Sequence, residues 1–155
     1  MPVSKYYLNL VGEYRVAAEL LKRELHATIT YGNAKGADIY AIGSNRRAAV
    51  VEVKSSNSGK FVTRFFQTYT DELKLHPDFW VLYWLADDGS EQFFVLSHAE
   101  LAVAQASRNS PNKILTWAES AQLFPQGVDN VLAKDLSEYR SDWDKIVEYC
   151  SEPLT

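Results

Sequence analysis

The side chains of Asp38, Glu52 and Lys54 are of the types that hold a metal ion and move protons. Residues 47–54 read Arg-Ala-Ala-Val-Val-Glu-Val-Lys, a composition typical of a strand. On a strand, the side-chain period of two places Glu52 and Lys54 on one face and the valines on the other. Asp38 begins the preceding predicted strand, so a hairpin would bring its carboxylate beside that of Glu52. Two carboxylates that converge in this way need a cation beside them.

Oxygen ligands of this kind are those that Mg²⁺ accepts, with water and a substrate phosphate completing its octahedron. The three histidines are far apart in the sequence and Cys150 is the lone cysteine, so no His or Cys pair offers a zinc site. A bound Mg²⁺ can activate water and stabilise the charge that develops on a phosphodiester, and a nearby lysine adds positive charge. These residue types predict phosphodiester hydrolysis with Mg²⁺, for which Mn²⁺ should substitute.

The Glu-x-Lys pattern is weak by itself. A glutamate and a lysine two positions apart could form a cross-strand salt bridge, and average composition produces the pattern about once in every few hundred residues. Glu72-Leu73-Lys74 is a second copy, on a predicted helix where residues two apart point in different directions. The presence of Asp38 one strand earlier distinguishes the first copy.

The elements that must position these residues can be read from hydrophobic periodicity. Apolar residues recur every three or four positions over residues 8–25, which predicts a first helix. Three strands follow at residues 27–31, 37–42 and 48–54, separated by turn residues, and their short connections predict antiparallel pairing.

After Lys54, the polar residues 55–59 predict a loop, and Phe61, Phe65, Tyr69 and Leu73 predict a second helix. The later elements follow by the same criteria: strands at 79–86 and 92–96, a helix at 98–106 capped by Ser97, an irregular stretch at 107–134, and a closing helix traced by Leu136, Tyr139, Trp143, Ile146 and Val147. The many aromatic residues of 61–84 have the spacing of core residues rather than of a base-stacking platform.

The order of these motifs resembles the PD-(D/E)XK nuclease superfamily, which includes restriction endonucleases and archaeal Holliday-junction resolvases. The resemblance rests on Gly12-Glu13 in the first helix, Gly36-Ala37-Asp38 and Glu52-Val53-Lys54. It covers about residues 8–97, and Ala37 stands where the family label has proline. It implies a restriction-endonuclease-like three-layer α/β/α fold, with a mixed sheet of about five strands and an α-β-β-β-α-β core. We expect a single domain over residues 1–155, with a C-terminal helical extension from about residue 98.

The resemblance also implies roles for individual residues. Asp38, Glu52 and Glu13 would bind the metal ion together with the backbone carbonyl of Val53, and Lys54 would position the attacking water. With Lys54, the three carboxylates form the expected catalytic set. Polar residues that flank the motif are candidates for substrate binding: Lys35, Ser55, Ser56, Lys60, Arg64 and Gln67.

The charge distribution is compatible with DNA as the partner. The net charge of −4 argues mildly against nucleic acid, but residues 1–74 carry 11 basic and 7 acidic residues, whereas residues 75–155 carry 5 and 13. The motif lies in the positive half. The sequence has no signal-peptide pattern and no apolar stretch long enough for a membrane span, so we expect a cytoplasmic protein that does not enter the membrane.

Two other functions remain open at this point. The chain could keep the fold but act only by binding, as an inhibitor or immunity protein whose acidic second half docks on a basic target. It could also be a nuclease that relies on a homodimer or on a partner protein for targeting, because no separate recognition domain is identifiable. The intact set of Asp38, Glu52 and Lys54 argues against the first.

Overall fold

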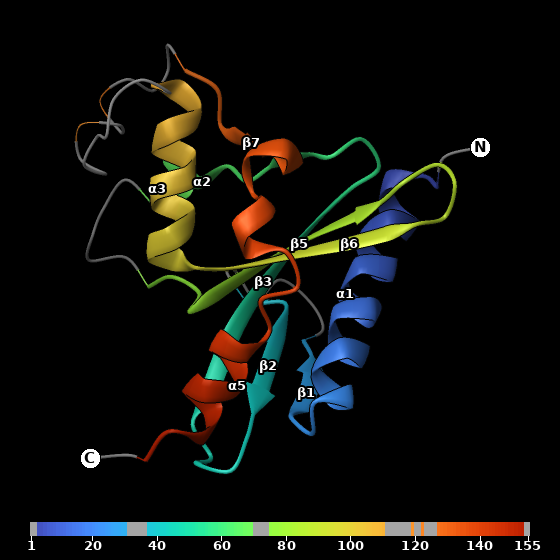
Figure 1. The fold of residues 1–155 in the computed structure, drawn as a ribbon, viewed down its shortest axis with the longest axis vertical. Coiled ribbons are helices and arrows are strands. Elements are labelled where there is room, and N and C mark those ends of the chain that lie inside the picture. The colour runs from blue at the N-terminus through green and yellow to red at the C-terminus, as the bar shows by residue number, and fades with distance from the viewer. Residues whose placement is uncertain are drawn as a thin grey trace.

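A five-stranded mixed sheet forms the centre of the molecule (Figure 1). The computed structural model describes residues 3–30, 37–69, 75–110, 119, 122 and 127–153. The strands are ordered β1-β2-β3-β5-β6, and β3 pairs with β5 in parallel while the other neighbours are antiparallel. Their bounds are His26–Ile29 for β1, Ile39–Ile42 for β2, Ala48–Ser56 for β3, Phe79–Leu85 for β5 and Glu91–Ser97 for β6. The predicted α/β class and mixed five-stranded sheet are confirmed.

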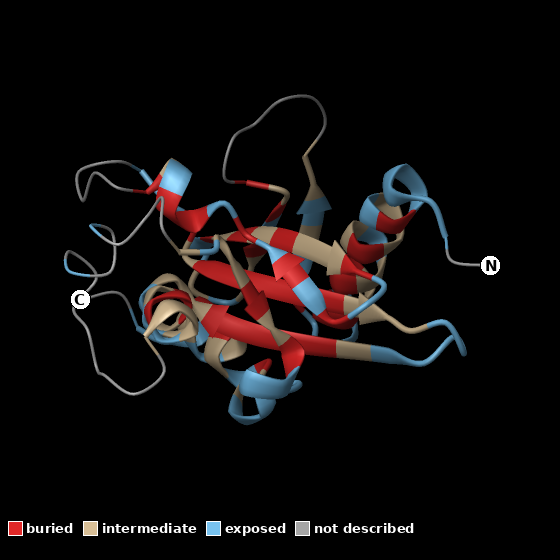
Figure 2. Cartoon of the chain, turned by 90° about the horizontal axis from the view of Figure 1, so that it is seen from above, coloured by how far each residue is buried: buried red, intermediate tan, exposed pale blue. Residues whose placement is uncertain are grey.

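One face of the sheet is covered by α1 (Lys5–Lys22) and α5 (Asp144–Ser151). Leu20 of α1 and Ile146 of α5 are fully buried against valines of β3, β5 and β6. Cys150 is a free thiol buried in the same core. Figure 2 shows buried residues concentrated between these layers and exposed residues on the outer helix faces. Within the part of the chain that the structure describes, no helix is long and apolar enough to cross a membrane.

The opposite face packs against α2 (Phe65–Thr68), α3 (His98–Asn109) and a small sheet of β4 (Lys60–Val62) and β7 (Asn130–Leu132). The described aromatic residues of 61–84 lie in the core as predicted, and only Trp84 among them is partly exposed. Ser97 caps α3: its hydroxyl accepts from the N–H of Glu100, and the Glu100 carboxylate accepts from the N–H of Ser97.

The prediction of a helix starting at Phe61 is wrong. Phe61 belongs to β4, where it pairs with Val131, and α2 begins only at Phe65. Arg64 adopts a left-handed conformation, which ends the strand. The side chain of Asp129 then accepts hydrogen bonds from the N–H groups of Phe66 and of the next residue, and so caps α2 from a distant part of the chain.

For the C-terminal part, one prediction agrees with the structure and one is wrong. The described part of the stretch predicted as irregular, with only short pieces of structure, contains the three-residue strand β7 and the 3₁₀ turn η1 (Ala133–Asp135). The closing helix does not begin at Leu136, because a second turn, η2 (Ser137–Tyr139), is followed by Ser141 with φ of 53°. The N–H of Ser141 donates to the carbonyl of Phe93 instead of continuing a helix. The helix proper is α5.

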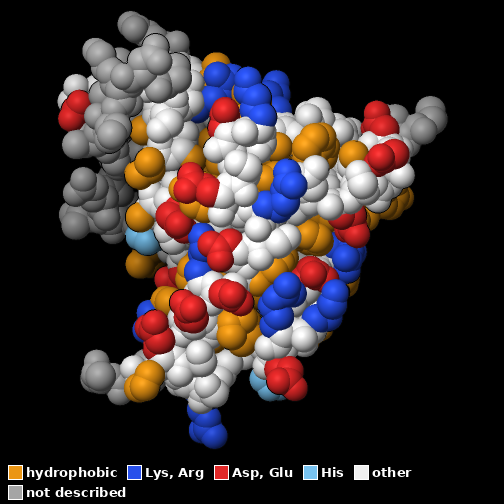
Figure 3. Space-filling model, viewed as in Figure 1, with side chains coloured by type: hydrophobic (Ala, Val, Ile, Leu, Met, Phe, Trp, Pro, Cys, Tyr) orange, Lys and Arg blue, Asp and Glu red, His pale blue; other side chains and the backbone are white. Residues whose placement is uncertain are grey.

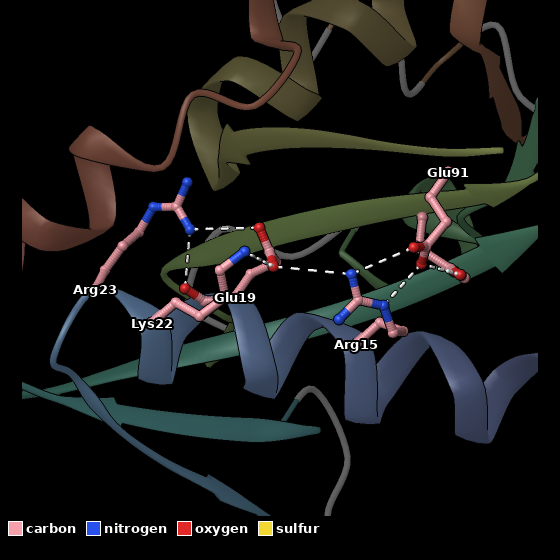
Figure 4. A network of polar contacts seen from close by, with 6 residues as sticks. Arg15, Glu19, Lys22, Arg23 and Glu91 are labelled. Carbon is pink, nitrogen blue, oxygen red and sulfur yellow. Dashed lines mark hydrogen bonds and ion pairs between the residues drawn. The ribbon is translucent and has the colours of Figure 1, made fainter.

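Ion pairs hold α1 on the sheet (Figure 4). Glu19 is buried and lies within ion-pair distance of Arg15, Lys22 and Arg23. Arg15 also contacts Glu91 at the start of β6, with 2.8 Å between Nε and Oε2. A buried carboxylate with three cationic partners is compensated for its lost hydration. The pairs of Glu19 lie within α1 and its C-terminal cap, and the pair of Arg15 with Glu91 connects this helix, which also carries Glu13, to the sheet.

Candidate active site

Asp38 and Glu52 converge as the hairpin predicts. Ile39 pairs with Val51 in the antiparallel register of β2 and β3, which places Asp38 opposite Glu52. One oxygen of Asp38 accepts from the N–H of Val53 at 2.8 Å, which fixes the orientation of its carboxylate.

The two oxygens of Glu52 have different surroundings. Oε1 lies 3.3 Å from Nζ of Lys54. Oε2 is buried and has no hydrogen-bond partner among the described residues. An unpaired buried carboxylate oxygen is costly, so this atom is suited to a ligand that the chain itself does not supply.

Glu13 reaches the two carboxylates from α1 because Gly12 lets the helix approach β3 closely. A Cβ on Gly12 would collide with the Ser55 hydroxyl and would lie 3.3 Å from the ring of Tyr83. The next residue, Glu13, lines the same cavity as Asp38 and Glu52, and the charges of both carboxylates act on it. Three carboxylates therefore share one site: Glu13 comes from α1, Asp38 immediately precedes β2, and Glu52 comes from β3.

This close approach predicts the effect of Gly12→Ala. Alanine is the better helix former by about 1 kcal/mol, yet the clash with Ser55 should lower the free energy of unfolding by about 1–3 kcal/mol. Ser55→Ala should recover part of the loss in the double variant, because it removes the colliding oxygen. Urea unfolding of the two single variants and the double variant measures this coupling. Strictly additive effects of the two substitutions would contradict the packing described here.

The three carboxylates have raised pKa values. Burial, followed by the charge of Asp38, raises the pKa of Glu13 to about 7. Burial and then the same charge raise the pKa of Glu52 to about 7, although Lys54 opposes the shift. Burial also raises the pKa of Asp38, against the hydrogen bond from Val53 and the charge of Lys54. The site has more negative charge than its own lysine compensates, and a divalent cation would remove the excess.

A cavity of about 430 Å³ opens beside these groups. Most of the predicted site residues line it: Glu13, Asp38, Glu52, Val53, Lys54, Ser55, Lys60 and Arg64. Gln67 is exposed on α2 and is not among the lining residues. The buried hydroxyl of Ser56 accepts hydrogen bonds from the N–H groups of Ser58 and Gly59, so it shapes the turn after β3. Lys35 lies outside the described residues.

Three further residues belong to the site and were not predicted. Lys5 and Asn9 line the cavity, two turns and one turn before Glu13 respectively. Their four-residue spacing places all three on one helix face, and this signal was available in the sequence. Tyr69 is the third: it is buried in the core, and burial together with the charges of Glu52 and Asp38 raises the pKa of its phenol to about 12.

The separation of His76 and His98 in the sequence suggested that they are isolated, but they are in contact in the structure. Their rings stack at 3.8 Å between centroids with an angle of 7° between the planes. His98 Nδ1 accepts from the indole N–H of Trp80, and burial lowers the pKa of His98 to about 4. Nitrogen lone pairs of stacked rings lie in parallel planes and do not converge on one ion, so this pair has a structural role.

The donor set fits a magnesium ion. Among the described residues, no three Asp, Glu, His or Cys side chains stand together as a preformed metal cage. Mg²⁺ does not require one, because it binds through one or two carboxylates and keeps several waters. Asp38 and Glu52 supply these carboxylates, and the unpartnered Oε2 of Glu52 is a free ligand atom. The residues present are therefore compatible with the ion.

The fold is shared with a known nuclease. No family model and no curated protein matches the chain. Among solved structures, the chain is similar to the bacterial homing endonuclease I-Ssp6803I, with a TM-score of 0.56 over 94% of each chain. The two sequences are 14% identical, so this likeness concerns the fold alone. The chain has a nuclease-like α/β fold.

Proposed function

We propose that the protein is a metal-dependent endonuclease of the PD-(D/E)XK type that hydrolyses phosphodiester bonds of DNA. The observation that carries this proposal is the convergence of Glu13, Asp38 and Glu52 beside Lys54 in a cavity lined by further basic side chains. Acidic groups for a cation and basic groups for phosphates are the two requirements of phosphodiester hydrolysis. The fold shared with a homing endonuclease supports the same function.

Each group has a role in this proposal. Asp38, Glu52 and the Val53 carbonyl would hold Mg²⁺ or Mn²⁺, and the bound ion would lower the pKa of water and neutralise charge on the phosphate. Glu13 approaches from α1, and with its raised pKa it would lose its proton when the cation binds. Lys54 donates to the attacking water and orients it in line with the scissile bond. No covalent intermediate with the protein is required.

The basic lining of the cavity would bind the substrate strand. Lys5, Lys60 and Arg64 line the same cavity as the carboxylates. Phosphate contacts of this kind position a nucleic acid without reading its sequence. The overall charge of −4 predicts modest, salt-sensitive affinity for DNA, which would favour a homodimer or a partner protein for targeting.

Cleavage of circular DNA tests the proposal. We expect the wild-type protein to cut supercoiled or single-stranded circles with Mg²⁺ or Mn²⁺ and not with EDTA. Lys54→Ala should lower the rate by a factor of about 10²–10³, because the water is no longer oriented. Lys74→Ala is the matched control from the second Glu-x-Lys copy and should cut normally. No cleavage with either metal would contradict the proposal, and tight binding to a basic protein instead would favour the inhibitor function.

A further inference from the structure

A second cavity lies beyond the end of β3 and shares Lys60 with the candidate active site. Its volume is about 310 Å³, at the lower limit for small-ligand sites and suited to a group of the size of one nucleobase. The pairing of β4 with β7 forms one wall, and Trp84 of β5 with Gln92 of β6 lines another. Glu52 and Ser56 are four residues apart on β3, about 13 Å, a span that a few nucleotides cover.

Two residues that line this cavity each have a buried polar atom without a partner among the described residues. Trp84 and Gln92 face each other across β5 and β6. The indole Nε1 of Trp84 and the amide Oε1 of Gln92 are both buried, and neither has a hydrogen-bond partner among the described residues. Buried polar groups are normally paired, so a missing donor and a missing acceptor at one place indicate a ligand that supplies both. The edge of a nucleobase carries donors and acceptors side by side.

The rim of the cavity is cationic. Lys60, Lys134 and Arg140 are exposed and line it, and none of the described acidic residues does. None of the three forms an ion pair within the described part of the chain. Figure 3 shows Lys and Arg side chains gathered at the upper edge of this face, near β7 and η1. Unpaired cations around a cavity attract a phosphate.

We propose that this second cavity binds one unpaired nucleotide of the substrate strand, a short distance from the bond that is cut. Trp84 and Gln92 contact the edge of its base, and Lys134 and Arg140 contact its phosphate. Lys60 lies between the two cavities and holds the connecting backbone. The inference rests on the proposed nuclease function, because it assigns this nucleotide to the same DNA strand. The protein would then prefer DNA with unpaired bases near the cleavage site.

Binding measurements in EDTA test this site separately from cleavage. The anisotropy of labelled single-stranded homopolymers of dT, dA or dC, each about 20 nucleotides long, gives the affinity and its salt dependence. We expect Lys134→Gln with Arg140→Gln to reduce the slope of log affinity against log salt by about 0.7, because one single-strand phosphate contact is lost. The matched control is Lys22→Gln with Arg46→Gln, which removes the same charge at sites that line neither cavity. Its slope should equal that of the wild type.

The base contacts have their own test. Trp84→Phe keeps an aromatic ring and removes the N–H, so it should narrow the differences in affinity between the three homopolymers. Unchanged preferences and an unchanged salt slope in the variants would overturn the second site even if the wild type cuts DNA. If the wild type does not cut DNA but the variants bind it differently from the wild type, the result would support the second site and contradict the nuclease function. No binding of the wild type to any homopolymer would also overturn the site.

Discussion

Glu52→Gln should abolish DNA cleavage and at the same time stabilise the protein at pH 8. The buried carboxylate of Glu52 has a pKa of about 7, compared with an ordinary value of 4.5. The folded state therefore disfavours the charged form, and a neutral glutamine removes this cost. The loss of a charged metal ligand should lower the cleavage rate by at least about 10³.

The pH dependence gives the sign of the stability effect. A carboxyl group whose pKa is raised by folding binds protons more tightly in the folded state, so its contribution to stability is complete below about pH 4.5 and is lost as the pH rises through about 7. The gain from Glu52→Gln should thus be small at pH 4.5 and on the order of 2 kcal/mol at pH 8. For a chain of this length, that gain corresponds to an increase in Tm of about 4–8 °C.

Thermal unfolding at the two pH values measures this effect. Glu72→Gln serves as the control, because it makes the same chemical change in the second Glu-x-Lys copy. A variant of Glu52 that is less stable than the wild type at pH 8 would show that the carboxylate stabilises the fold, contrary to its burial without a partner for Oε2.

Mg²⁺ should stabilise the protein strongly at pH 8 and weakly at pH 5.5. The ion binds to deprotonated carboxylates, whereas the raised pKa values of Glu13 and Glu52 leave them largely protonated at pH 5.5. A ligand that binds only the folded state adds about 2.7 kcal/mol when its concentration is 100 times its Kd. Removing Mg²⁺ with EDTA should reverse the effect.

The change in Tm on adding Mg²⁺ is the measurement, and Asp38→Asn should reduce it most. Asp87→Asn is a suitable control, since Asp87 is an exposed carboxylate in the turn between β5 and β6. An equal response of both variants would mean that the ion acts on surface charge in general. A response of the wild type that is larger at pH 5.5 than at pH 8 would contradict a carboxylate site.

The sequence predicts the main sheet well because its longer strands have clear patterns. The alternation around Glu52 and the short turn before Ala48 predict both the hairpin and the pairing of Asp38 with Glu52. The strand β5 is an uninterrupted apolar run, as expected of a parallel-paired strand covered on both faces.

The remaining errors concern structure that depends on distant partners. β4 and β7 have three residues each, too few for any periodicity, and they pair across about 70 residues of chain. The spacing of Phe61 and Phe65 is compatible with a helix as well as with the observed strand. The start of α2 depends on the left-handed conformation of Arg64 and on the cap from Asp129. The organisation of residues 1–155 as one domain stays a prediction.

The site shows the same division. The local strand pattern predicts Asp38, Glu52 and Lys54 as site residues. Glu13 is predicted only by the family resemblance, because its position beside Asp38 depends on the close approach of α1 at Gly12. Tyr69 could not be predicted, because an aromatic residue with core spacing gives no sign that its hydroxyl lies near charged groups.

A metal-dependent active site at Glu52 can be tested by the nicking of supercoiled DNA. The proteins to compare are the wild type, Glu52→Gln and Glu72→Gln, each with Mn²⁺ and with EDTA. We predict nicking by the wild type and by Glu72→Gln only in the presence of the metal, and no nicking by a folded Glu52→Gln variant. Equal nicking by all three proteins, or nicking that persists in EDTA, would contradict a metal-dependent site built on Asp38, Glu52 and Lys54.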